Sequence, residues 1–323
     1  MMPVKKILIK LNGLHYRQEY LCFAKESYTQ PLHAYLVNDG CIIKDITYQH
    51  LFVGYSPLIF AFPKNAVIEL TETIRLMFSH KVLHENDIFS EKDALAFINM
   101  KLVKEQVAGN NNISYFEGFH AEHHFLSGFH QFINSIYNRL YNKRPGNVFL
   151  PGNLYKQVQI AYAIPRIISL IAVSNNNLYN LFPTDLHGQV DEEHYIISLR
   201  IGGKACEQAE ATGKLLISQM NCKAYKTVYA LGKNHMQELR SKDNFPFSRL
   251  LSEKFQLPLP EDVISYKELE LINSFPHGIH KLMLFKIVWR QQIEPETATL
   301  AHIHNAYATW RYKNKFPGNY LLR

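Results

Sequence analysis

The sequence has few cysteines, and their spacing fits neither of the common structural uses of cysteine. Among its 323 residues only Cys22, Cys41, Cys206 and Cys222 occur, and no two of them form a C-x-x-C pair. This pattern excludes a disulfide framework and a structural zinc site of the usual ligand spacing. A reducing cytoplasm is therefore the predicted location.

Long hydrophobic runs are also absent. The best of them, such as Ile167 to Val173, is broken well short of the ~20 residues that a membrane helix needs. Near the start, Lys5 and Lys6 are followed only by Ile7 to Ile9 before the next lysine, which is too short for the core of a signal peptide. Neither a membrane span nor secretion is expected.

The glycine motifs of the common nucleotide-binding and hydrolase folds are missing. There is no G-x-G-x-x-G and no G-x-S-x-G, and both Gly213-Lys214 and Gly232-Lys233 lack the upstream glycine of a P-loop. The chain therefore carries no Rossmann, P-loop or α/β-hydrolase signature.

The composition that is present is that of a folded protein with a basic balance. Hydrophobic residues make up 47% and charged residues 20%, and the length predicts about two domains. The 35 basic and 28 acidic residues give a net charge of +7, which favours phosphate-bearing partners. Because the basic residues are dispersed, with no sustained basic and aromatic patch, a nucleic acid is not the expected partner. Salt-dependent retention of the protein on DNA would be needed to support a nucleic-acid or polyanion binder instead.

The first part of the chain predicts strands followed by helices. Alternating residues at Leu32–Val37 and Ile42–Tyr48 flank Asn38-Asp39-Gly40, a tight-turn sequence, so they predict a hairpin. A further strand is expected over His50–Phe62. Apolar residues one turn apart then predict three helices, which would include Val67 to Met77, Ala94 to Val107 and Glu122 to Asn142, the last ended by Lys143-Arg144-Pro145-Gly146.

After that break, short strands and tight turns dominate. The pattern predicts two short helices, Lys204–Ala211 and Lys223–Leu231, with Gly213 and Gly232 as their left-handed caps. It also predicts a helix over Pro295–Tyr312 and strands at Tyr155–Ala163, Arg166–Val173, Leu178–Phe182, Tyr195–Arg200, Leu215–Met220, Tyr266–Ser274 and Ile279–Trp289. Many short strands with tight turns favour an antiparallel barrel. The expected domains are residues 1–145, 146–295 and 296–323.

Histidine is abundant, with 16 residues, and the densest cluster contains Glu117, His120, His123 and His124. Glu117 and His120 have the E-x-x-H spacing of bundled carboxylate metal sites, but such sites need a second copy and further carboxylates. No metal is therefore expected, and surface or core-edge histidines are the simpler interpretation.

Four blocks of the second part resemble, in order, those of the flavin reductase-like family. They are Pro165–Ser174, Asn180–Leu186, Ser198–Arg200 with Lys204–Cys206, and Gly278–Val288. The resemblance covers about Asn147 to Arg290 and implies the FMN-binding split β-barrel. The implied fold class is α+β, an antiparallel Greek-key split β-barrel with an N-terminal α+β extension and a C-terminal helix.

The same resemblance implies a flavin site, with FMN rather than FAD as the cofactor. Ring and ribityl contacts are expected from Asn180 and the segment after it, and phosphate contacts from Arg200 and Lys204, where a helix start also favours an anion. Asp185 and Cys206 depart from the family pattern, and Asp185 is expected to face the polar edge of the ring or a structural partner. The implied cofactor-binding residues are Asn180, Phe182, Pro183, Thr184, Asp185, Leu186, Ser198, Arg200, Lys204, His235 and His280.

The implied activity is an NAD(P)H-dependent flavin reductase-like oxidoreductase that transfers hydride to the bound flavin, with NADH or NADPH as donor. No catalytic acid or base is named, since hydride transfer does not require one. The alternative is a flavin-binding or electron-transfer protein without turnover of its own. The family also implies a homodimer. The first ~145 residues match no motif, and three roles stay open for them: covering the barrel, replacing a dimer contact, or restricting access to the flavin.

Overall fold

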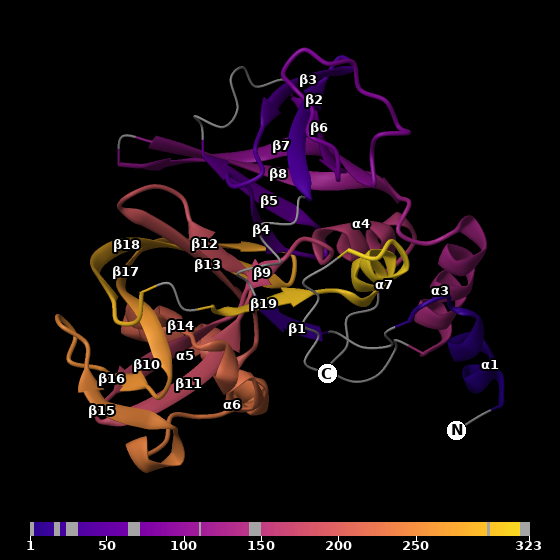
Figure 1. The fold of residues 1–323 in the computed structure, drawn as a ribbon. Coiled ribbons are helices and arrows are strands. Elements are labelled where there is room, and N and C mark those ends of the chain that lie inside the picture. The colour runs from indigo at the N-terminus through magenta and orange to yellow at the C-terminus, as the bar shows by residue number, and fades with distance from the viewer. Residues whose placement is uncertain are drawn as a thin grey trace.

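The computed structural model describes residues 3–15, 20–23, 32–63, 72–109, 111–141, 150–295 and 298–316. The fold is α+β, with two large antiparallel sheets, a small third sheet and a few helices (Figure 1). No helix among the described residues is long and apolar enough to cross a membrane.

The N-terminal sheet has seven antiparallel strands in the order β3-β2-β6-β7-β8-β5-β4. It occupies the upper part of Figure 1, and its longest members, β7 and β8, form one hairpin. The strands are β2 (His33–Asn38), β3 (Cys41–Asp45), β4 (Leu51–Gly54), β5 (Ile59–Pro63), β6 (Thr73–Ser79), β7 (Ala96–Ala108) and β8 (Asn111–His123).

The C-terminal sheet also has seven antiparallel strands, in the order β11-β10-β14-β17-β18-β13-β12. The strands are β10 (Ser169–Asn175), β11 (Leu178–Thr184), β12 (His187–Gln189), β13 (His194–Arg200), β14 (Lys214–Met220), β17 (Val263–His277) and β18 (His280–Gln292). A two-stranded ribbon, β15 (Phe247–Leu251) with β16 (Pro258–Pro260), is inserted before β17.

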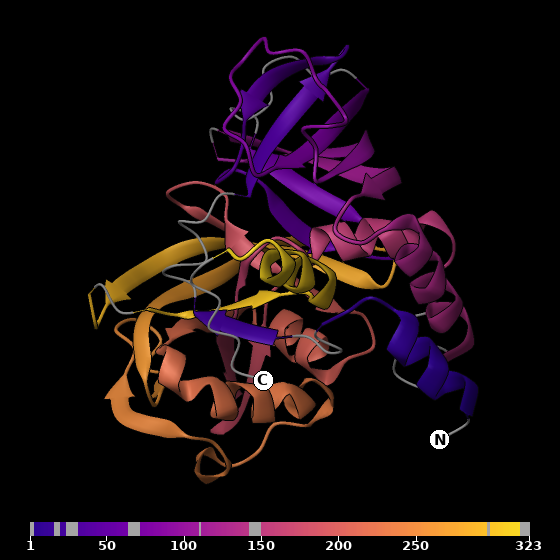
Figure 2. The same ribbon diagram turned by 45° about the vertical axis from the view of Figure 1, so that its right-hand side comes forward.

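Helices and the small sheet connect the two large sheets. Figures 1 and 2 show α4 and α7 between the two sheets and α1 against α3 at one side of the molecule. The small sheet pairs β19 (Leu300–Ile303) with β1 (Tyr20–Phe23) and β9 (Arg166–Ile167). The helices are α1 (Pro3–Leu11), α3 (Gly128–Tyr141), α4 (Asn153–Ala161), α5 (Lys204–Thr212), α6 (Tyr225–Ala230) and α7 (Asn305–Lys313), with short 3-10 turns around α6.

Most strands of the second part and the hairpin of β2 with β3 lie where the sequence predicted them, but two predicted helices are wrong. Ile74 and Met77 lie on β6, whereas Val67 and Leu70 lie outside the described residues. The segment predicted as the helix Ala94–Val107 is β7, along which exposure alternates from Met100 onward. Apolar residues three or four positions apart are compatible with either an α-helix or a β-strand. This segment is a strand because it pairs along its length with β8.

Four other elements also differ from prediction, and one of them, the strand expected over His50–Phe62, is two strands, β4 and β5. Tyr155–Ala163, predicted as a strand, contains most of α4, which buries Val158 and Ile160 against the N-terminal sheet. The predicted helix Glu122–Asn142 is split, since β8 continues to His123 and α3 begins at Gly128. The predicted helix Pro295–Tyr312 consists of β19 and α7. The predicted stop at Lys143–Gly146 and the boundary at residue 145 lie outside the described residues.

The two helix caps had different outcomes. Gly213 ends α5 in the left-handed conformation with a φ of +61°, as predicted. Gly232 lies inside the 3-10 turn Leu231–Met236 and has no positive φ, so that prediction is wrong.

An apolar cluster joins the two large sheets. Its members include Ala61 of β5 and Tyr115 of β8 on one side, and Ile196 of β13 and Leu284 of β18 on the other, all buried. The hairpin turns reach across as well, because Gly278, at the turn of β17 and β18, lies against the backbone of Ser56. The faces of the two sheets are therefore packed as one core.

Replacing Gly278 by alanine should destabilise the protein more than replacing Gly213. Both have positive φ, +56° and +61°, so each new Cβ is strained by about 1–2 kcal/mol. At Gly278 the Cβ also collides with the carbonyl oxygen of Ser56 and with Pro57, whereas at Gly213 nothing lies within 4 Å. In urea unfolding, Gly278→Ala should cost at least about 2 kcal/mol more than Gly213→Ala. Equal losses would show that the contact between the sheets is dispensable.

Candidate functional site

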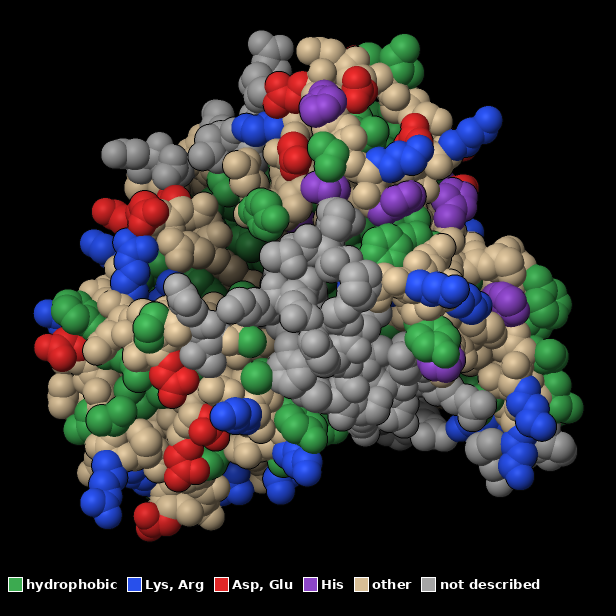
Figure 3. All heavy atoms as spheres, in the orientation of Figure 1, with side chains coloured by type: hydrophobic (Ala, Val, Ile, Leu, Met, Phe, Trp, Pro, Cys, Tyr) green, Lys and Arg blue, Asp and Glu red, His purple; other side chains and the backbone are tan. Residues whose placement is uncertain are grey.

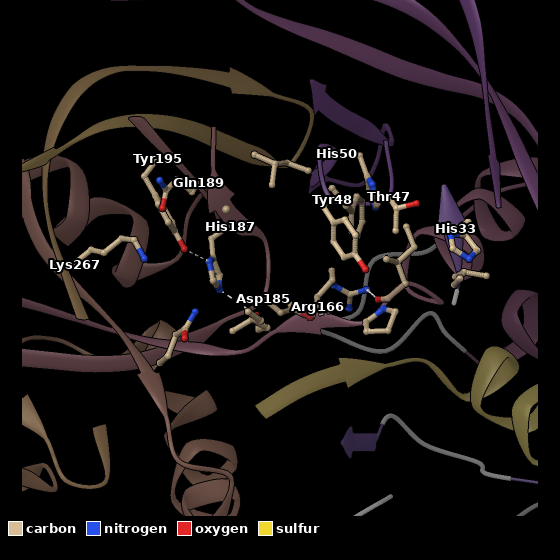
Figure 4. Close-up of a pocket in the computed structure, with 18 residues that line it drawn as sticks. His33, Thr47, Tyr48, His50, Arg166, Asp185, His187, Gln189, Tyr195 and Lys267 are labelled. Atoms are coloured by element: carbon tan, nitrogen blue, oxygen red, sulfur yellow. Dashed lines mark hydrogen bonds and ion pairs between the residues drawn. The ribbon is translucent and has the colours of Figure 1, made fainter. Parts of the chain in front are cut away.

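A cavity of about 410 Å³ lies where the two large sheets meet. Side chains of both sheets face each other across it in Figure 4, and Figure 3 shows a hollow between the upper and lower left parts of the molecule. Its size is that of a small-molecule site. It is lined by Leu32, His33, Thr47, Tyr48, His50, Leu51, Phe52, Ile164, Pro165, Arg166, Ile167, Asp185, His187, Gly188, Gln189, Tyr195, Gln219 and Lys267.

Burial keeps the ring of His187 neutral, and two hydrogen bonds fix its orientation. Its Nε2 lies 3.1 Å from the carbonyl oxygen of Ile167, and its Nδ1 lies 2.7 Å from the hydroxyl of Tyr195. Burial lowers the pKa of His187 to about 4, so the ring carries one proton at neutral pH. Because a carbonyl can only accept, that proton is on Nε2, and Nδ1 accepts from the Tyr195 hydroxyl.

A buried ion pair forms the floor of the cavity beside His187. Nη2 of Arg166 donates to Oδ2 of Asp185 at 2.8 Å, and Nδ1 of His302 on β19 donates to the same oxygen at 2.9 Å. Burial alone would raise the pKa of Asp185, but Arg166 and His302 together hold it well below its ordinary value. The guanidinium of Arg166 also lies over the ring of Tyr162, 4.2 Å from its centroid. Asp185 thus lines the cavity and has structural partners as well.

Lys267 is a half-buried cation on the cavity wall. Its amino group points toward Tyr195 and His187 in Figure 4, and no carboxylate among the described residues lies within ion-pair distance of it. Burial, and then the nearby Arg290, lower its pKa. A desolvated ammonium without a carboxylate partner attracts an anionic or electron-rich group of a ligand.

The N-terminal sheet contributes a less polar wall. Nδ1 of His50 donates to the carbonyl of Ile46 at 2.9 Å, and burial lowers the pKa of this histidine. Its ring packs near those of Phe60 and Phe78. The cavity therefore has a polar side from the C-terminal sheet and an aromatic side from the N-terminal sheet.

Of the residues predicted from the sequence, Ser198, Arg200 and His280 share the face of the C-terminal sheet that meets the N-terminal sheet. Arg200 pairs with His280, and Ser198 with Leu282, a member of the cluster between the sheets. His280 is 3% exposed and its ring contacts that of Tyr55 from the N-terminal half, with 4.7 Å between centroids. Neither nitrogen of His280 nor the hydroxyl of Ser198 has a hydrogen-bond partner among the described residues.

Several other predicted residues have structural partners. Asn180 donates to Gln208 and to the carbonyl of Asn234, and Phe182 and Leu186 are buried in core clusters. Nε2 of His235 lies 2.7 Å from the carbonyl oxygen of Pro183, to which it donates, and burial lowers the pKa of His235. Thr184 is buried at the end of β11.

Lys204 and Cys206 stand at the start of α5, outside the lining of the cavity. The amino group of Lys204 forms ion pairs with Glu207 at 3.1 Å and with Glu238 at 3.0 Å. Cys206 is buried, and burial raises the pKa of its thiol to about 11, so it is not a reactive thiolate. Only Asp185 of the predicted set lines the cavity.

Sequence reasoning missed His50, His187, Tyr195 and Lys267. His187 follows directly on the second matched block and Tyr195 precedes the third. Their proximity to the blocks was a usable signal, whereas Lys267 joins them only through the sheet, in which β18 pairs with both β17 and β13. The histidine cluster has ordinary contacts: Nε2 of His123 lies 3.2 Å from Gln159, and His120 pairs with Glu122 at 3.5 Å. Among the described residues no group of three or more potential ligands could hold a metal.

No protein-family model matches the chain, and no curated protein does. Among solved structures, an FMN-binding protein of Thermus thermophilus is 17% identical over 44% of this chain and 83% of its own, with a TM-score of 0.39. An NADH:FAD oxidoreductase of Streptomyces globisporus is 12% identical over 50% of this chain and 94% of its own, with a TM-score of 0.42. The flavin reductase component of a bacterial tryptophan halogenase is 9% identical over 45% and 91%, with a TM-score of 0.40. Each of these three solved structures is similar to between 44% and 50% of this chain.

The buried histidines predict a loss of stability in mild acid. The folded pKa of His280 is about 4, lowered by burial and then by Arg200, against an ordinary value of 6.5. Unfolding therefore takes up a proton, so the contribution to stability is complete above pH 6.5 and declines as the pH falls toward 4. At pH 5 the loss from one such group is about 2 kcal/mol. In urea unfolding, His280→Met should shrink the difference between pH 7.5 and pH 5 by about that amount, and an unchanged difference would contradict the assignment.

Proposed function

We propose that this protein is a flavin-binding oxidoreductase whose flavin ring occupies the cavity between the two sheets. The observation that carries the proposal is the lining: Pro165, Arg166 and Ile167 of the first matched block meet Asp185 of the second at the cavity wall. The family resemblance assigns the second of these segments to the ring and ribityl chain, and the first is the matched block that meets it at the cavity wall. The finer fold that goes with the proposal is a Greek-key split β-barrel formed by the C-terminal sheet, within residues 146–295.

The chemistry of the residues fits a flavin. A flat ring needs aromatic and aliphatic walls, which Phe52, Ile167 and Tyr48 provide, and polar groups for one edge. Lys267 is the cation available for the electron-rich edge, since the charge of Arg166 is already paired with Asp185. Both ring nitrogens of His187 are hydrogen-bonded to the protein, so its proposed role is to hold Tyr195 in place on the cavity wall.

The ribityl phosphate is proposed to extend from Asp185 toward the start of α5. Asp185 influences the pKa of both His235 and His280, so these side chains are its electrostatic neighbours. The unpaired Ser198 hydroxyl and His280 ring then offer hydrogen bonds to a ligand. The N–H groups of Cys206 and Glu207 donate to the carbonyl of Gly203, but the first turn of α5 has no side-chain cap. The positive end of the helix dipole there favours a phosphate, with Arg200 and Lys204 as the proposed cations.

A bound flavin would supply hydride and electron transfer, and the protein binds and orients the ring and limits solvent access. NADH or NADPH is the proposed donor, with FMN favoured over FAD. The rival is a flavin-binding protein that passes electrons to a partner without oxidising a nicotinamide itself. Steady-state oxidation of NADH or NADPH by the flavin-loaded protein distinguishes the two.

The first prediction of this proposal is a flavin spectrum. Protein purified under native conditions, before and after addition of FMN, should show the visible absorbance spectrum of a bound flavin. Mass analysis of the ligand released on denaturation should identify FMN. Riboflavin should bind more weakly than FMN, because it lacks the phosphate. Colourless protein that also fails to bind added FMN would remove the proposal.

A charge variant inside the cavity tests the location of the ring. Lys267→Met should weaken FMN binding about tenfold, while the free energy of unfolding stays the same or rises, because a desolvated ammonium is replaced by an apolar chain of similar length. Lys286→Met, at an exposed lysine of the neighbouring β18, is the matched control and should change neither quantity. Titration of flavin fluorescence and urea unfolding give the two readouts. Equal affinities for both variants would place the ring elsewhere.

A further inference from the structure

The two large sheets have the same strand order. Strands β2, β3, β4, β5, β6, β7 and β8 of the N-terminal sheet correspond, in chain order, to β10, β11, β12, β13, β14, β17 and β18 of the C-terminal sheet. With this correspondence, the order β3-β2-β6-β7-β8-β5-β4 becomes β11-β10-β14-β17-β18-β13-β12, which is the order observed. Every neighbour of every strand is preserved, and every pair is antiparallel in both sheets. The N-terminal half therefore repeats the architecture of the C-terminal half.

The irregularities of the long hairpins repeat as well. In β7 the register with β8 shifts between Asn99 and Met100 and again between Leu102 and Lys104. In β17 the register with β18 shifts between Glu268 and Leu269 and between Leu271 and Asn273. Both shifts come at the same distance from the hairpin turn. Bulges are specific features of a sheet, so their repetition is evidence that the two hairpins correspond residue by residue.

This correspondence assigns each position of one sheet an equivalent position in the other. At several of these positions, the equivalent residues make similar contacts. Three equivalent pairs belong to the cluster between the sheets: Ala61 with Ile196, Ile113 with Leu282, and Tyr115 with Leu284. The ring of His50 packs near Phe60, and the equivalent His187 packs on the equivalent Tyr195. Both histidines line the one cavity.

The contacts between the sheets are reciprocal. Gly109, at the turn of β7 and β8, lies against the ring of His194 at the start of β13. Its equivalent Gly278 lies against Ser56, just before β5, the strand equivalent to β13. Strands β4 and β12, which are equivalent, also meet each other, with Gly188 against Leu51. Such two-way contacts are those of an isologous interface between two subunits.

We infer that this chain is a fused pseudo-dimer: the N-terminal sheet holds the place of a second subunit, and a single ligand site is completed within one chain. The sequence left three roles open for the N-terminal part. The pseudo-dimer corresponds to the second of them, in which the N-terminal part replaces the contact with another subunit. The homodimer predicted from the family resemblance is then unnecessary, because the face that would pair with another copy is already covered.

The two halves differ in polarity at equivalent positions, and this difference limits the sites to one. Lys267 corresponds to the fully buried Ile98, Tyr195 to Phe60, and Ser198 to Pro63. The C-terminal half thus keeps the cation and hydroxyls, while the N-terminal half has apolar residues in their places. What the N-terminal half supplies in return is packing, above all Tyr55, whose ring contacts His280.

The test measures the mass of the full chain and its ligand stoichiometry. Sedimentation at micromolar concentration should give a single particle of one chain, 37.6 kDa. A stable two-chain particle would overturn the inference. The stoichiometry rests on the proposed function: one FMN per chain is expected, and two per chain would overturn the single site. A one-chain particle that binds no FMN would remove the flavin proposal and leave the fused pseudo-dimer standing.

A variant tests whether the N-terminal half completes the site. Tyr55→Leu should weaken FMN binding about tenfold without changing the mass of the particle, because Tyr55 positions His280. Tyr229→Leu, an exposed tyrosine on α6, is the control and should bind FMN as the parent does. If Tyr55→Leu binds FMN with the same affinity as the parent, the C-terminal half forms the site without the N-terminal half.

Discussion

The apolar contact between the two seven-stranded sheets is the constraint on which the rest of the structure depends. Each sheet has one face in its own core, and the buried cluster of Tyr115, Ile196 and Leu284 covers the opposite face. Because both faces are covered, strands such as β5 and β13 are buried at almost every position. Because the covering surface comes from the same chain, the packing is intramolecular and its geometry is fixed by folding.

The cavity depends on this packing. Its aromatic wall belongs to one sheet and its polar wall to the other, so neither sheet encloses it alone. The buried pair of Arg166 and Asp185 stabilises the junction, since His302 of β19 and the carbonyl of Ala161 at the end of α4 also bind it. Hydrogen bonds from these two further elements offset the cost of burying two charges. The polar groups of the cavity floor are therefore already paired, whereas Lys267 and His280, whose ring nitrogens have no hydrogen-bond partner among the described residues, leave interactions open for a ligand.

The comparison of prediction with structure shows which signals are local. The hairpin at Asn38-Asp39-Gly40 and the cap at Gly213 were predictable, because a positive φ at a turn is a property of one or two residues. The helix predicted over Ala94–Val107 failed for the opposite reason: its apolar spacing suits either structure, and only the partner strand β8 decides. The first half consequently looked unlike the second in sequence, although the two sheets share one strand order.

The sequence by itself determined the turns, most strands of the second half, the absence of common nucleotide-binding motifs and the four blocks that resemble flavin reductases. It also located Asp185, which the cavity contains. Tertiary structure alone decided that His50 and His187 line one cavity, that Lys267 faces Tyr195, and that the first half repeats the second. These facts join residues that are more than 70 positions apart, and such contacts depend on sheet order and packing, which local sequence patterns do not encode.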